Sequence, residues 1–264
     1  MRSNNLSTAL PIDGDAALAG PPFVLRWDEP SKPLPLRAVR APIRARASAL
    51  RCEAPGWLPT GPHDQPFDFC GHIRRLCVDI VARCDELRHI DVSRLLFGMT
   101  QARSSRLDGL QARVTPLRFR DGCLRRQRHG IPYQVQRYFV GCQEMLYLVT
   151  FCLPRFLDRD FDDKFITLFH ELFHIGLSFN GDLRRHAGRY DVHSHSKRTY
   201  DARMANLARE YLSGGADPGL HGFLRMNFAQ LQQRHGQVTA VVVPRPKLIP
   251  VVRGPSHAAR TAPP

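Results

Sequence analysis

The sequence is short of lysine, of paired cysteines and of long apolar runs. No stretch of about eighteen apolar residues occurs, so we expect no membrane-spanning segment. The seven cysteines include no Cys-x-x-Cys pair, which argues against both a disulfide framework and a thiolate zinc site. Only 4 of the 38 basic residues are lysines. Because this arginine bias can arise from coding composition, the net charge of +14 does not by itself indicate a nucleic-acid partner.

The N-terminal part of the chain is broken by prolines and carries no hydrophobic period. Asp13 and Asp15 interrupt its short apolar pieces, so the unbroken apolar stretch of a signal peptide is missing and we expect a cytoplasmic location. Proline, alanine and arginine dominate residues 1–64, which predicts a disordered leader. Residues 65–250 then form a single folded domain, and residues 251–264 form a disordered tail.

Within this domain, helical and strand-like patterns alternate, which predicts an α+β fold with a small mixed sheet. Cysteines spaced by seven, Cys70, Cys77 and Cys84, lie on the apolar face of a first helix that starts near Phe67, and we expect them to be buried. Further helices are predicted over 162–178, from Tyr200 to Leu212 and over 219–234. Strands are predicted over residues 92–99, 112–120, 133–140, 145–153 and 238–243.

The most informative feature is the pentapeptide His170-Glu171-Leu172-Phe173-His174 in the second predicted helix. Residues i and i+4 share a helix face, so both imidazoles can bind one zinc ion. Glu171 is then placed to take a proton from metal-bound water. Random placement of the chain's 12 histidines and 6 glutamates gives roughly 0.01 such matches, so chance is a poor explanation.

A catalytic zinc site usually has three protein ligands and one open position, so one further donor is needed. The extended metalloprotease pattern fails, because Leu177 and Asn180 stand where its glycine and histidine belong. Glu210 is one remaining candidate. His193 and His195 lie in the loop before the Tyr200 helix, and in an extended segment only one of the two can face the metal. We favour His193, with His195 as the alternate.

The stretch from about Leu146 to Leu212 resembles a family of bacterial and phage metallopeptidases and, more distantly, the SprT-like zinc proteases. The resemblance rests on Leu-Pro-Arg-Phe-Leu before the helix, His-Glu-Leu-Phe-His-Ile within it, and the segments 179–185, 193–196 and Tyr200-Asp201 after it. It implies a zincin-like domain that binds zinc through His170, His174 and His193 or His195, with Glu171 as the general base. The chain lacks the histidine-glycine loop signature and the zinc-ribbon cysteines of SprT-like proteins.

The sequence therefore predicts a zinc-dependent metallopeptidase that acts on a peptide or protein substrate, with Zn²⁺ as its cofactor. Tyr200, Arg184 or Arg185 is a candidate to stabilise the oxyanion, although core packing for the tyrosine and solvent exposure for the arginines are alternatives. Asp182 is better suited to shape the loop after the helix or to pair with these arginines. The strand over 145–153 forms either the edge of the substrate cleft or the interior of the sheet.

A rival interpretation is a basic binding protein that keeps the zincin fold with a structural zinc and acts as a regulator or a DNA-associated factor. The presence of Glu171 argues against it, because a structural zinc has no use for a general base. The sequence leaves the oligomeric state open.

Overall fold

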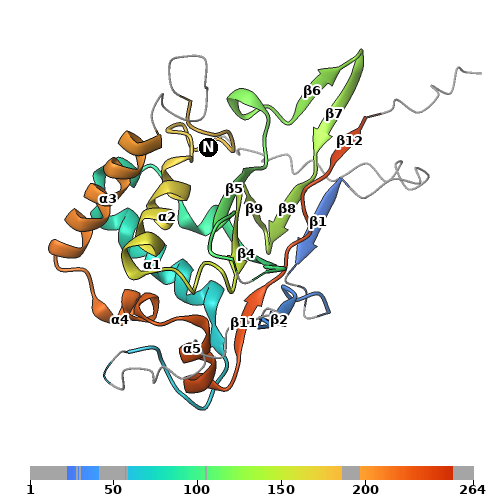
Figure 1. Ribbon diagram of the computed structural model, residues 1–264. Helices are drawn as coiled ribbons and strands as arrows, with labels where there is room; N and C mark the ends of the chain where they lie inside the picture. The colour runs from blue at the N-terminus through green and yellow to red at the C-terminus, as the bar shows by residue number, and fades with distance from the viewer. Residues whose placement is uncertain are drawn as a thin grey trace, which may run out of the picture.

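The computed structural model describes residues 23–27, 29, 31–41, 57, 59–104, 106–185 and 197–251. Helices gather on one side of the molecule and strands on the other (Figure 1). This arrangement confirms the α+β class. The helices are α1 (Phe69–Arg83), α2 (Phe161–Phe173), α3 (Lys197–Ser213), α4 (Pro218–His221) and α5 (Phe228–His235), with 3-10 turns η2 (Asp85–Leu87), η3 (Val92–Arg94), η4 (Arg120–Gly122) and η5 (Gly222–Arg225).

The described strands form four small sheets of three strands each. They are β1 (Val24–Trp27), β2 (Leu36–Ala38), β3 (Phe67–Asp68), β4 (Leu95–Gln101), β5 (Ala112–Pro116), β6 (Arg125–Arg128), β7 (Ile131–Val135), β8 (Arg137–Val140), β9 (Gln143–Met145), β10 (Tyr147–Leu153), β11 (Val238–Val241) and β12 (Leu248–Pro250). Their orders are β1-β8-β9, β4-β10-β5, β2-β11-β3 and β12-β7-β6. No described helix is both long and apolar enough to cross a membrane.

The sheet that matters for the site is β4-β10-β5. Strand β10 is its central strand, parallel to β4 and antiparallel to β5, so the sheet is mixed as expected. Of the two alternatives for residues 145–153, the interior strand is the one observed. Strands β4 and β5 are the two edges of this sheet, and β5 contacts α2.

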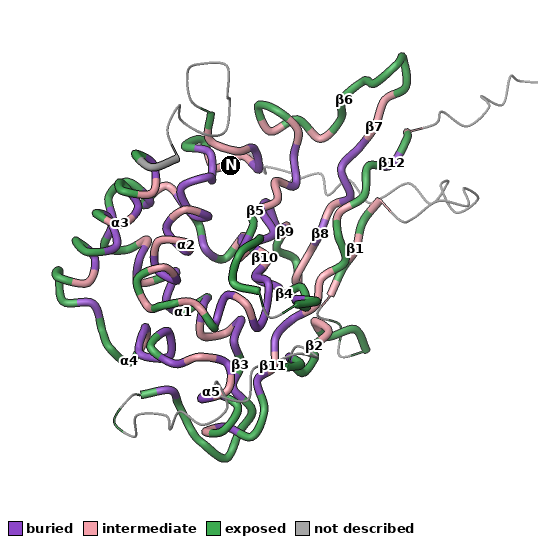
Figure 2. Tube along the Cα trace, in the orientation of Figure 1, coloured by how far each residue is buried: buried purple, intermediate pink, exposed green. Residues whose placement is uncertain are grey.

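The two faces of this sheet differ because side chains alternate along each strand. One face carries Val114, Val149 and Phe151, which pack into the main core together with the buried faces of α1, α2 and α3. The other face carries Leu148, which belongs to a smaller cluster with Tyr138 of β8. Buried segments accordingly run through the centre of the tube in Figure 2, whereas strand β6 is exposed along its length.

Helix α1 is explained by its apolar period. Cys70, Cys77 and Cys84 are buried as predicted, and burial raises the pKa of Cys70 to about 12 and that of Cys84 to about 11. Such thiols stay protonated and act as small apolar side chains. The helix begins at Phe69, close to the predicted start, and ends at Arg83, so that Cys84 is its C-cap.

The expectation of a disordered leader over residues 1–64 is wrong for two stretches. Strand β1 pairs in parallel with β8, and β2 pairs with β11. Prolines next to these strands do not prevent pairing, because a proline still offers its carbonyl: Pro35 O accepts the N–H of Val242 at 2.9 Å. Residues 1–22, most of 42–58 and residues 252–264 lie outside the described residues.

Lys164 of α2 is 1 % exposed and fixes the helix to η5 and to the residue that follows it. Its Nζ donates to Leu224 O at 2.9 Å and to Met226 O at 2.8 Å. Burial lowers the pKa of Lys164 to about 8, and the nearby carboxylates of Asp158 and Asp160 limit the decrease. The lysine therefore links α2 to two backbone carbonyls. Without its Nζ, these buried carbonyls would lose this hydrogen-bond donor.

We predict that Lys164 makes stability rise with pH above about 8. The unfolded chain holds the Lys164 proton up to its ordinary pKa, whereas the folded chain releases it earlier, so unfolding becomes costlier by about 1.4 kcal/mol for each pH unit in this window. In urea unfolding at pH 8, 9 and 10, the free energy of unfolding of the wild type should rise relative to that of Lys164→Met. A stability difference that does not change with pH would contradict the assignment.

Candidate active site

Helix α2 carries the pentapeptide that runs from His170 to His174 at its C-terminal end. Phe161 is its first residue and Asp160 occupies the N-cap position, close to the predicted start at residue 162. The helix ends at Phe173, five residues before the predicted end at Ser178. His174 is the C-cap and still has helical dihedrals, with its N–H directed to His170 O. The two histidines therefore remain on one face.

The rings of His170 and His174 lie close together. Their centroids are 4.6 Å apart with an interplanar angle of 80°, which suits two ligands of one ion. Asp201 of α3 faces the first of them, with its Oδ1 3.7 Å from His170 Nδ1. A carboxylate on the Nδ1 side orients the imidazole and leaves its Nε2 for a metal. The sequence pattern assigns no such role to Asp201, because its partner lies on another helix.

Glu171 is 7 % exposed and is held by an edge strand rather than by solvent. Its Oε2 accepts the backbone N–H of Val114 in β5 at 2.6 Å. Burial raises the pKa of Glu171 to about 7, against the lowering effects of this hydrogen bond and of Arg113. A carboxylate with a pKa near 7 is suited to accept and return a proton at neutral pH.

A cleft of about 920 Å³ opens beside these residues. His170, Glu171, Tyr200 and Asp201 line one side, and residues 107–112, which lead into β5, line the other. Arg155 holds this second wall by donating to Arg106 O at 2.8 Å and to Leu110 O at 3.1 Å. Leu107 and Leu110 are 44 % and 48 % exposed, so this wall presents apolar side chains to the cleft that His170 also lines.

Tyr200 packs directly on the two histidines. Its ring centroid is 4.8 Å from that of His170 and 5.9 Å from that of His174, and the second pair is nearly parallel at 22°. The residue is 5 % exposed, and burial raises the pKa of its phenol above the ordinary value. Tyr200 thus both packs in the core and borders the cleft.

Arg184 and Arg185 do not line the cleft. Arg184 stacks its guanidinium on Phe173, 3.8 Å from the ring centroid, and its backbone N–H donates to His174 O at 2.7 Å. Arg185 pairs with Asp182 at 3.1 Å. Both therefore secure the chain around the end of α2, and the oxyanion role considered for them has no support in their positions.

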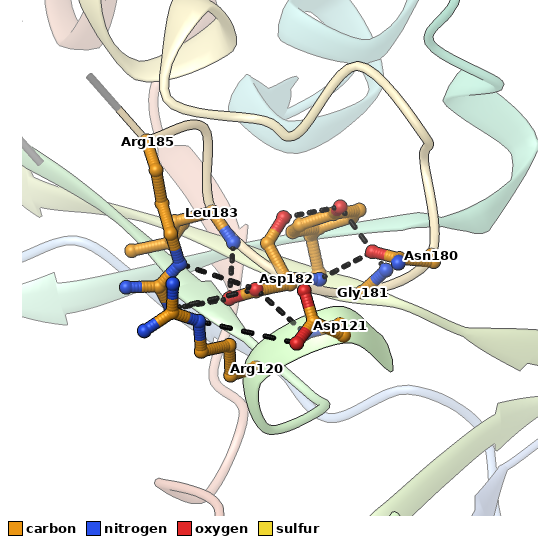
Figure 3. Close-up of polar contacts among 8 residues, drawn as sticks. Arg120, Asp121, Asn180, Gly181, Asp182, Leu183 and Arg185 are labelled. Carbon is orange, nitrogen blue, oxygen red and sulfur yellow. Dashed lines mark hydrogen bonds and ion pairs between the residues drawn. The ribbon is translucent and has the colours of Figure 1, made fainter. Parts of the chain in front are cut away.

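Asp182 organises the loop after the helix (Figure 3). Its carboxylate accepts the N–H groups of Asp121 at 3.0 Å and Leu183 at 2.8 Å, in addition to its contact with Arg185. Its backbone oxygen accepts Tyr147 Oη at 2.7 Å and Gly176 N at 3.1 Å. The loop role predicted for Asp182 agrees with this geometry, and a role in the cleft does not.

The candidates for a third ligand divide between two places. Glu210 is exposed near the far end of α3, in a separate small pocket with Arg83 and Glu86, and is not part of the site. His193 and His195 lie outside the described residues. Within the described part of the chain, no group of three or more His, Cys, Asp or Glu side chains is arranged to hold a metal ion.

Comparisons of this chain with protein-family profiles, curated proteins and solved structures found no match. The site is therefore argued from its own geometry.

We predict that Gly176 is required to hold His174 in place. A Cβ at this position would meet Asp182 O at 2.7 Å, so alanine must force apart the chain segments around the Ile175–Leu183 bridge. Gly176→Ala should cost about 1–3 kcal/mol in urea unfolding, as overpacking usually does. Ser178→Ala, at an exposed position two residues on, serves as the control. Equal stability of the two variants would contradict this account.

Proposed function

We propose that this protein is a zinc-dependent metallopeptidase with a zincin-like domain. The observation that carries the proposal is the buried Glu171 carboxylate, with a pKa near 7, which lines a cleft together with His170, whose ring lies 4.6 Å from that of His174. His170, His174 and His193 or His195 would hold the ion. Bound zinc would lower the pKa of its water and polarise the scissile carbonyl.

The residues of the chain itself have separable tasks. Glu171 accepts a proton from the attacking water and returns it to the leaving amine, and the Val114 N–H fixes one of its oxygens while it does so. The Asp201 carboxylate lies 3.7 Å from His170 Nδ1, where its charge favours a proton on Nδ1 and so leaves Nε2 for the metal. Tyr200 limits the rotation of both histidines by packing on them and keeps water from that side of the pair.

The edge strand β5 supports an extended peptide as the substrate. The Val114 N–H points away from β10, since it is donated to Glu171, and the backbone of Ala112 faces the same way by alternation. Ala112 lines the cleft. An extended peptide can pair with this edge, while Leu107 and Leu110 offer apolar contacts to its side chains.

A non-catalytic binding protein with a structural zinc remains the competing proposal. A structural site closes all four positions around the metal and needs no acid or base. The position of Glu171 at an open cleft favours catalysis over this alternative.

We predict about one zinc per chain in the purified protein, and loss of most of it in His170→Ala and in His174→Ala. Elemental analysis after dialysis measures the content. His72→Ala is the matched control, because His72 lies on α1 and is hydrogen-bonded to Asp68 O. Zinc retained in full by both variants would reject the ligand assignment.

The same measurement decides the third ligand. If His193 is the third ligand, His193→Ala should weaken zinc binding. If only His195→Ala loses zinc, then His195 is the third ligand instead.

We predict that Glu171→Gln keeps the zinc but abolishes peptide hydrolysis. Glutamine is nearly isosteric and glutamate is not a ligand in this assignment, so only proton transfer is lost, with a rate loss of several orders of magnitude. The wild type and the variant should be compared on denatured protein and on a peptide library. A zinc-loaded wild type that cleaves nothing in this screen would favour the binding protein, and an active Glu171→Gln would remove Glu171 as the base.

A further inference from the structure

A second cavity, of about 660 Å³, lies on the opposite side of the β4-β10-β5 sheet from helix α2. Four arginines line it: Arg37, Arg40, Arg113 and Arg245. Among the described residues around this cavity there is no aspartate or glutamate. None of the four forms an ion pair with a carboxylate in the described part of the chain.

The four arginines come from segments that are far apart in the sequence. Arg37 lies in β2, which pairs with β11, and Arg245 follows β11. Gln101 at the end of β4 fixes the Arg40 backbone, since it accepts the Arg40 N–H at 3.1 Å and donates to Arg40 O at 2.9 Å. Arg113 lies in β5, directly opposite Thr150 of β10. The fold thus brings three distant segments together, one with Arg37 and Arg40, one with Arg113 and one with Arg245, and so gathers four like charges around one cavity.

The floor of the cavity adds neutral donors. Thr150 and Arg113 are cross-strand partners, as are Leu148 and Thr115, so these side chains share one face of the sheet. Thr100 also lines the cavity. Three hydroxyls beneath four guanidinium groups can surround an oxyanion with donors from several directions.

These features select the ligand by its chemistry. Like charges repel one another unless water or an anion compensates them, and the planar guanidinium binds phosphate oxygens in pairs. A cavity of this size accommodates a small molecule. No aromatic side chain is among the described residues that line it, so it offers no surface on which a nucleobase can stack.

We propose that this cavity is a binding site for closely spaced phosphate groups. The ligand is recognised through its phosphates and not through a base, so both a small polyphosphate and the backbone of a nucleic acid meet the requirement. The cavity lies on the other face of the sheet from the proposed zinc centre, and Arg113 links the two because its charge also lowers the pKa of Glu171. The test of the cavity needs neither metal nor peptidase activity.

The test is calorimetric titration of the full-length protein with sodium tripolyphosphate at 0.15 M salt, where the Debye length is about 8 Å and attraction between exposed charges farther apart than this is largely screened. The double variant Arg113→Gln/Arg245→Gln should bind at least about tenfold more weakly, because two charge-assisted contacts are removed. The matched control is Arg126→Gln/Arg128→Gln, which removes the same charge from the exposed strand β6 and should change the Kd less than about twofold.

A variant that leaves the net charge unchanged distinguishes specific binding in the cavity from non-specific electrostatic attraction. Thr150→Val keeps both charge and strand propensity, and its loss of one donor should weaken binding by about threefold to tenfold. Circular dichroism verifies that each variant is folded, and Arg37→Gln/Arg40→Gln replaces the first pair if that pair fails to fold. No binding at millimolar tripolyphosphate, or equal losses in the β6 control, would overturn the proposal.

Two further ligands identify the anion and its source. Citrate carries a similar charge on carboxylates, and binding as tight as that of tripolyphosphate would show that phosphate is not what is recognised. A 12-nucleotide single strand that is displaced by tripolyphosphate and loses affinity in Arg113→Gln/Arg245→Gln would support the proposal with a nucleic-acid backbone as the source. Binding of tripolyphosphate without the oligonucleotide would support it with a small polyphosphate instead.

Discussion

The arrangement of the cleft depends on the hydrogen bond between the Val114 N–H and Glu171. Helix α2 and strand β5 come from segments about fifty residues apart, and this bond of 2.6 Å fixes the position of the helix along the strand. The bond also sets the position of the carboxylate relative to the imidazoles, because Glu171 is next to His170 in the chain. A buried carboxylate without this donor would carry the full cost of desolvation.

The C-terminal end of α2 is fixed by backbone groups. His174 O accepts the Arg184 N–H, and Asp182 O accepts the Gly176 N–H, so the loop turns back on the helix as soon as it ends. Asp182 gives this loop its shape: its carboxylate binds the N–H of Asp121 in η4 and pairs with Arg185 of the loop itself (Figure 3). Its backbone oxygen accepts the hydroxyl of Tyr147 in β10. The position of His174 is therefore defined by the sheet and the loop as well as by the helix.

The sequence predicts a part of the structure well when the interactions that form it join residues close together in the chain. The apolar periods of α1, α2 and α3 are local signals, and they correctly indicated the helices and their buried faces. The early end of α2 depends on Asp182, and the pairing of β2 depends on β11, about two hundred residues away, so neither has a local signal. The same holds for the contact between Asp201 and His170, which joins two helices. A run such as 145–153 does not reveal whether it lies inside a sheet or at its edge, because that depends on the strands that pair with it.

Strand β5 is the common wall of two cavities. Ala112 lines the cleft beside His170, whereas Arg113 and Thr115 line the arginine cavity on the other face of the sheet. A ligand that shifts this strand from one side alters the shape of both cavities, and thermodynamic linkage makes such an effect reciprocal. If an anion in the arginine cavity changes the affinity of the cleft for a peptide by some factor, then the peptide changes the affinity for the anion by the same factor, and β5 is a strand that contributes residues to both cavities.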